Sequence, residues 1–141
     1  MSIVDFLESV SLKTIRPGRL ISDYDRSTIS AGEKEIKLTL QSAYGEDKTD
    51  PTKYILKFSA CAEVVDDETH EKVLSVTFET NYFFDIINTE KITEVTDEQR
   101  TAISSAMVYL DFRSRLVRIL SDVGLSSVKV PLSPINALAQ E

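Results

Sequence analysis

The sequence predicts an α+β fold: a four-stranded antiparallel sheet followed by one long C-terminal helix and a short terminal segment. Alternating apolar and polar residues, divided by polar loops, recur over most of the chain before residue 88. Helical periodicity then dominates residues 96–124. A run of strands followed by a helix is typical of α+β domains. We expect residues 1–141 to form a single domain, because two domains of half this length would each have a marginal core.

Four segments are expected to form the strands. They are residues 10–24, 35–41, 54–63 and 73–87, and a short apolar piece, residues 3–7, precedes the first. In the first strand, Pro17 and Gly18 indicate a bend in an edge strand. In the second, Ile36, Leu38 and Leu40 alternate with polar residues, which is typical of a half-buried strand. The fourth ends in the most aromatic stretch of the chain, residues 82–87.

The long helix is marked at both ends. Thr96 and Gln99 have the spacing of a capping box at its start, and Gly124 can take the left-handed conformation that ends a helix. A first apolar stripe consists of Ile103, Ala106, Met107, Leu110, Val117 and Leu120, and a second stripe, nearly opposite, consists of Val108, Phe112, Leu116, Ile119 and Val123.

A helix on the surface of its own domain needs only one apolar stripe. We therefore expect the first stripe to meet the sheet of its own domain and the second stripe to meet other subunits. The alternative is a helix buried on both sides within one monomer.

Composition excludes several classes of function. With 16 basic and 23 acidic residues, the net charge of −7 argues against a nucleic-acid or anionic-membrane binder. The single cysteine, Cys61, is expected in the core and excludes both an intramolecular disulfide and a cysteine-based zinc site. We expect neither a secretory signal nor a membrane span, and place the protein in the cytoplasm.

Catalytic groups that could work together are missing from the pattern. The only histidine, His70, stands in an acidic turn, and none of the four glycines belongs to a phosphate-binding array. A small enzyme of the hotdog kind would place its central helix after an early strand, whereas this long helix comes last. We expect no enzymatic activity, no metal and no cofactor.

The order of these elements resembles that of SecB, the bacterial protein-export chaperone. The residues that carry the resemblance are Tyr109-Leu-Asp-Phe-Arg113 in the helix, Gly124-Leu125 after it, and Pro134-Ile135-Asn136 near the end. The resemblance implies a tetramer, built as a dimer of dimers, that binds unfolded chains without ATP and delivers them to the export motor. Family members often carry the acids that dock the motor where this chain has Leu20 and Thr77, so the motor stays an open partner.

We therefore expect a holdase, an ATP-independent chaperone of unfolded or aggregation-prone polypeptides. The expected peptide-binding residues are Phe78, Tyr82, Phe83, Phe84, Ile86, Leu125, Ile135 and Leu138, and the expected oligomer interface is the second stripe. A narrower alternative is a dedicated chaperone of an antitoxin, as for SecB-like members found beside toxin–antitoxin pairs. Another is a structural protein in which self-association consumes all of this apolar surface.

Overall fold

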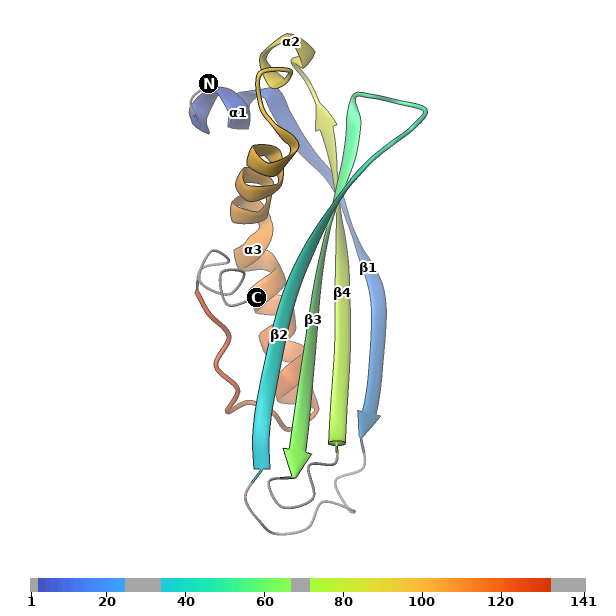
Figure 1. The fold of residues 1–141 in the computed structure, drawn as a ribbon, viewed down its shortest axis with the longest axis vertical. Helices are drawn as coiled ribbons and strands as arrows, with labels where there is room; N and C mark the ends of the chain where they lie inside the picture. Colours follow the sequence, from blue (N-terminus) through green and yellow to red (C-terminus); the bar gives the residue numbers. More distant parts are fainter. Residues whose placement is uncertain (1–2, 25–33, 67–71, 133–141) are drawn as a thin grey trace.

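The computed structural model describes residues 3–24, 34–66 and 72–132 (Figure 1). The elements are α1 (Ile3–Ser9), β1 (Val10–Tyr24), β2 (Lys34–Glu46), β3 (Lys53–Asp66), β4 (Lys72–Ile86), α2 (Thr89–Ile92) and α3 (Asp97–Asp122). The predicted fold class, four antiparallel strands followed by a long helix, is confirmed. The two short helices, α1 and α2, were not predicted.

The strands form one antiparallel sheet in the order β1-β4-β3-β2. β1 therefore lies at one edge, as the proline predicted, and its register against β4 shifts between Pro17 and Leu20. A Cβ atom built on Gly18 would lie 3.0 Å from the Cβ of Glu79, so the close approach of the two strands favours glycine at this position. β2 forms the opposite edge.

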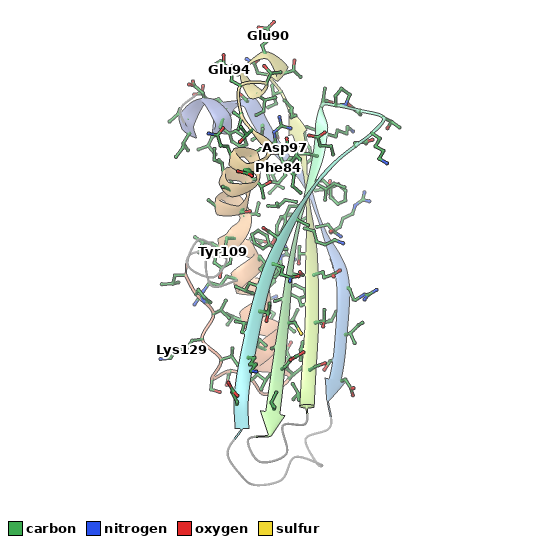
Figure 2. The ribbon with its side chains drawn as sticks, viewed as in Figure 1. Phe84, Glu90, Glu94, Asp97, Tyr109 and Lys129 are labelled. Carbon is green, nitrogen blue, oxygen red and sulfur yellow. The ribbon has the colours of Figure 1, made fainter. Side chains whose placement is uncertain are left out.

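One face of the sheet, the inner face, is covered by α3 (Figure 1). The ring of Phe112 stacks on Phe58 at 5.1 Å and on Phe78 at 5.4 Å, measured between ring centroids. Tyr54 and Phe84, from β3 and β4, stack at 4.9 Å in the same layer. The core therefore lies between the sheet and the helix, with stacked aromatic rings among its aliphatic side chains (Figure 2).

Both ends of α3 are fixed by the predicted signals. The N–H of Gln99 donates to Thr96 Oγ1 at 3.1 Å, and the N–H of Thr96 donates to Gln99 Oε1 at 3.1 Å, which completes the capping box. At the other end Gly124 has a φ of 82°, and the N–H of Leu125 donates to the carbonyl of Leu120 at 2.7 Å. This is the hydrogen bond of a Schellman motif.

The structure reverses the predicted roles of the two stripes of α3. Val108, Phe112 and Leu116 of the second stripe are buried against the domain's own sheet, and Ile119 and Val123 pack against the same core while half-buried. Val108, Phe112 and Leu116 thus cannot form the predicted oligomer interface, because their side chains fill the monomer's core.

The first stripe is the one that the sheet leaves uncovered. Leu110 is 65% exposed, and Met107 and Val117 are also exposed. Leu120, which we assigned to this stripe, is buried in the core instead. The physical reason is the ring of Phe112, since it fills the space between α3 and the sheet, and the first stripe has no aromatic side chain.

Most of the predicted peptide-binding residues are also buried. Phe78, Tyr82, Phe84 and Ile86 lie on the inner face under α3, and Leu125 is buried where the chain leaves the helix. They offer almost no accessible surface, because α3 packs directly on the inner face. Phe84 nevertheless contributes to the lining of a pocket of about 470 Å³, described below. Phe83 is half-buried on the other face, and the predictions for Ile135, Leu138 and His70 lie outside the described residues.

Candidate functional site

A pocket of about 370 Å³ lies between the edge strand β2 and the first half of α3. The residues that line it are Ser42, Tyr44, Asp97, Glu98, Thr101, Ala102 and Ser105. Most of them are polar residues, but the atoms that they expose to the pocket are mainly carbon. Ser42 and Tyr44 stand opposite Phe58 and Leu56 of β3, so they belong to the inner face, where the edge of the sheet meets the helix. An extended polypeptide lying here would contact both elements.

Hydrogen-bonding groups in and beside this pocket lack partners within the described residues. The Ser105 hydroxyl is buried and has no hydrogen-bond partner among the described residues. β2 pairs only with β3 within the described part of the chain, so the backbone N–H and C=O groups on its outer edge are unpaired by any strand. Such an edge can bind an extended peptide through main-chain hydrogen bonds that do not depend on sequence.

Arg100 holds the wall of the pocket in place. Its Nη1 donates to the Tyr44 hydroxyl at 2.6 Å, and that hydroxyl donates to Glu46 Oε1 at 3.0 Å. The guanidinium also lies 5.8 Å from the ring centroid of Tyr44 and 5.7 Å from that of Tyr54. Burial, with a smaller contribution from the hydrogen bond to Glu46, raises the pKa of Tyr44 to about 12, so the phenol stays protonated at neutral pH.

A second pocket, of about 610 Å³, lies between α1 and α3. All of its lining side chains are apolar: Ile3, Leu7, Ala102, Ile103, Ala106 and Met107. Ile3 is 64% exposed and Leu7 is 43% exposed. Ala102 lines both pockets, so they form one continuous surface around the first half of α3, which we call the α3 surface.

The sequence predicted part of the α3 surface as apolar, but assigned it to contacts with the sheet of the same domain. Ile103, Ala106 and Met107 were recognised as the first stripe but assigned to the sheet. Ile3 and Leu7 carry a detectable signal, since they are apolar residues four positions apart, the spacing of one helix face. Tyr44 and Ser105 carry no such signal.

A carboxylate on the polar side of α3 fixes the helix against the sheet. The Tyr82 hydroxyl donates to Asp111 Oδ2 at 2.8 Å, and Arg115 Nε donates to the same oxygen at 2.7 Å. Burial acts to raise the pKa of Asp111, but the hydrogen bonds from Arg115 and Tyr82 outweigh it and leave the pKa lowered. The pKa of Tyr82 is raised, first by burial and then by its bond to Asp111.

The described residues show neither a metal-binding cluster nor a membrane helix. Over residues 3–24, 34–66 and 72–132, no group of three His, Cys, Asp or Glu side chains could hold a metal ion. None of the helices in these ranges has the length and apolar character needed to cross a bilayer.

The arrangement of sheet and helix matches a solved structure over nearly its whole length. The match is to the Mycobacterium tuberculosis Rv1957 SecB-like chaperone, solved in complex with a ChAD peptide from the Rv1956 HigA1 antitoxin, with a TM-score of 0.61. It covers 92% of this chain and 94% of that chain. The chain has a SecB-like fold. Sequence identity is 15%, so the likeness concerns the SecB-like fold and transfers no residue roles.

Comparison of sequences alone adds no relative. No family model matches the chain, and a search of curated proteins finds no significant match. The SecB-like fold is thus visible in the element order, which the sequence pattern predicted, and in the three-dimensional arrangement.

Proposed function

We propose that this protein is an ATP-independent chaperone of the cytoplasm, a holdase that captures apolar segments of non-native polypeptides on the α3 surface. The observation that carries the proposal is the continuity of two apolar pockets through Ala102, beside an edge strand. The SecB-like fold, shared with a protein described as a chaperone, supports it.

The α3 surface offers the two kinds of interaction that a holdase needs. Apolar side chains gain about 25 cal/mol for each Å² of apolar surface removed from water, whatever the order of residues in the client. The edge of β2 offers main-chain hydrogen bonds to any extended segment. Affinity without sequence specificity follows from this combination.

The uncovered first stripe supports self-association as part of the same proposal. Beyond the pockets, Leu110 and Val117 continue the apolar surface along α3, whose 26 residues measure about 39 Å at 1.5 Å per residue. An apolar surface of this length suits a second helix of the same chain. We propose that copies associate through these residues, in a tetramer built as a dimer of dimers.

A narrower function is favoured by the comparison with Rv1957. That protein was solved with a ChAD peptide of the HigA1 antitoxin. We propose as the second candidate a dedicated chaperone of one antitoxin. Co-purification with a single polypeptide would support it, whereas recovery of many unrelated chains would favour the general holdase. Of these two candidates, only the general holdase would deliver preproteins to an export motor.

The holdase proposal is tested by suppression of aggregation. We expect the purified protein, in excess, to slow light scattering by a chemically denatured client diluted from guanidinium. Ala102→Glu places a charge on the exposed joint of the two pockets and is expected to remove most of this protection with little change in Tm, because burying an unpaired charge against a client is unfavourable.

Arg118→Glu is the matched control, since Arg118 is exposed on the polar side of the same helix. It is expected to protect the client like the unchanged protein. Absence of protection by the unchanged protein would refute the holdase proposal, and equal loss in both variants would move the site away from the α3 surface.

A further inference from the structure

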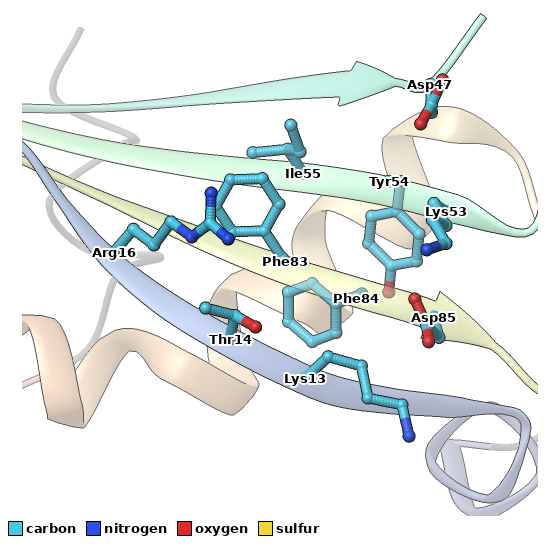
Figure 3. A pocket seen from close by; sticks show the side chains of 10 residues that line it. All are labelled: Lys13, Thr14, Arg16, Asp47, Lys53, Tyr54, Ile55, Phe83, Phe84 and Asp85. Atoms are coloured by element: carbon cyan, nitrogen blue, oxygen red, sulfur yellow. The ribbon is translucent and has the colours of Figure 1, made fainter. Parts of the chain in front are cut away.

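The outer face of the sheet, which α3 does not cover, has a pocket of its own. The pocket measures about 470 Å³ and lies near the hairpin that joins β2 and β3 (Figure 3). Arg16, Phe83 and Ile55 lie toward one end of the pocket, and Lys13 and Lys53 lie toward the other. Most of its lining residues stand on the opposite side of the sheet from the α3 surface, and Tyr54 and Phe84, which are buried on the inner face, also line it.

The strand register arranges this pocket in rows across the sheet. One row is apolar at its centre, because Phe83 of β4 stands between Thr14 of β1 and Ile55 of β3. Gly45 of β2 ends the row, and a Cβ atom built on it would meet nothing within 4 Å, so the row is open on that side. Phe83 and Ile55 are each half-buried and form an apolar slot.

Basic side chains stand on both sides of the apolar slot. The row toward the middle of the sheet has Arg16 opposite Asn81, and Asn81 opposite Lys57. The row toward the hairpin has Lys53 opposite Asp85, and Lys13, in the irregular part of β1, lies on the other side of β4 from Lys53 (Figure 3). None of the three cations Lys13, Arg16 and Lys53 forms a close ion pair with another described residue. The charge of Lys53 nevertheless helps to lower the pKa values of Asp47 and Asp50, so it is partly compensated.

Arg16 is held in the slot by an aromatic ring. Its guanidinium carbon lies 5.2 Å from the ring centroid of Phe83, a cation–π distance (Figure 3). This contact leaves the N–H groups of Arg16 free to donate, within the described residues, and an arginine fork suits a carboxylate.

Two acids also line the pocket, and one of them is already engaged. Asp47 Oδ1 accepts hydrogen bonds from the N–H of Thr49 at 2.9 Å and from its hydroxyl at 2.7 Å, and these lower its pKa. Asp85 stands opposite Lys53 in the strand register. The three basic residues outnumber these two acids, in a chain whose net charge is −7.

We propose that this pocket binds an acidic peptide segment carrying one large apolar side chain. The apolar side chain lies on Phe83 and Ile55, and carboxylates on either side of it meet Arg16 and Lys53. Because the chain as a whole is acidic, this local patch attracts an acidic partner mainly at short range, and binding depends on salt. The proposal does not rest on the holdase function, since it concerns the other face of the sheet.

The test measures fluorescence polarisation of a labelled peptide, Glu-Asp-Leu-Phe-Asp-Glu, against the full chain. We expect saturable binding that weakens at high salt, and at least about tenfold weaker binding by the double variant Arg16→Glu, Lys53→Glu, since charge-assisted contacts are lost and repulsion is added. Phe83→Ala is expected to weaken binding as well. The peptides Glu-Asp-Ala-Ala-Asp-Glu and Lys-Lys-Leu-Phe-Lys-Lys should bind less well than the acidic, apolar one.

Lys37→Glu is the matched control for the charge reversal. Lys37 is exposed and stands on the same face of the sheet, eight residues before Gly45 on β2, about 27 Å away at 3.4 Å per residue. It is expected to bind like the unchanged protein, and Ala102→Glu should bind the peptide normally even though it loses client protection.

Three results would overturn the proposal. The first is absence of peptide binding, or equal binding of the acidic and basic peptides. The second is tighter binding of a six-residue oligothymidine, which would assign the pocket to single-stranded nucleic acid. The third is a change in molecular mass in the double variant together with no peptide binding, which would assign the pocket to a second copy of the chain.

Discussion

The two apolar stripes of α3 are similar in hydrophobicity but differ strongly in burial. Phe112 of the second stripe has no exposed surface, whereas Leu110, two residues away on the same helix, is 65% exposed. Both stripes extend along the same helix. The difference lies in volume: one stripe offers a ring that stacks on two aromatics of the sheet, and the other offers aliphatic and small side chains. Both stripes are apolar enough to be buried. The shape and volume of the side chains determine which stripe packs against the sheet.

The largest expected effect comes from truncating the buried stripe. Phe112→Ala should destabilise the fold by about 3–5 kcal/mol, because it removes two stacked contacts and leaves a cavity. Leu110→Ala, its matched control, should change the free energy of unfolding of the monomer by less than about 0.5 kcal/mol, so both variants are compared at concentrations too low for association. Urea unfolding followed by circular dichroism measures both. Equal losses in the two variants would show that both stripes are buried in the folded protein.

The next effect concerns the boundary between the stripes, at Asp111. Asp111→Ala removes the acceptor of the buried Tyr82 hydroxyl and should cost about 1–3 kcal/mol. The folded pKa of Asp111 is lowered, so its contribution is present above the unfolded value of about 3.9 and is lost as pH falls through the folded value.

The free energy of unfolding, measured as a function of pH, therefore distinguishes the unchanged protein from the Asp111→Ala variant. The unchanged protein should lose its advantage over the Asp111→Ala variant as the pH falls below about 4. A constant difference in the free energy of unfolding across that range would mean that Asp111 contributes through packing and not through its charge.

The smallest effect on folding is expected at the exposed stripe, where the effect on assembly should be large. At concentrations low enough to keep the protein monomeric, Leu110→Glu should alter the Tm by no more than about 2 °C, because the side chain faces solvent in the monomer. It should lower the molecular mass measured by light scattering if copies meet through this stripe. An unchanged mass in the variant, or a monomer in the unchanged protein, would contradict association through the first stripe.

The sequence predicted the elements better than their contacts. The first strand was predicted with the bounds it has, and Thr96, Gln99 and Gly124 marked the ends of the long helix, because capping depends on residues within a few positions of one another. The periodicity also separated the two stripes correctly apart from Leu120. It did not indicate which stripe meets the sheet, since Phe112 contacts residues more than 30 positions away.

The missed parts have similar causes. α1 was read only as a short apolar piece, because β1 follows it without a break, and α2 has only four residues. The alternation of residues 82–86 did place Phe83 on the other face from its neighbours, which is its observed position. The β2–α3 pocket could not be predicted, because Tyr44 and Arg100 come together only after the strand and helix have packed.

The strand order has a consequence for how the chain is made. β1 pairs with β4, so Val10 cannot form its strand pair until Ile86 has been synthesised. The helix that covers the inner face is synthesised after all four strands. Until α3 leaves the ribosome, Phe58, Phe78 and their neighbours are without their cover. A nascent chain in this condition has the exposed apolar surface that promotes aggregation. During its own synthesis, the protein is thus for a time the kind of polypeptide that a holdase would bind.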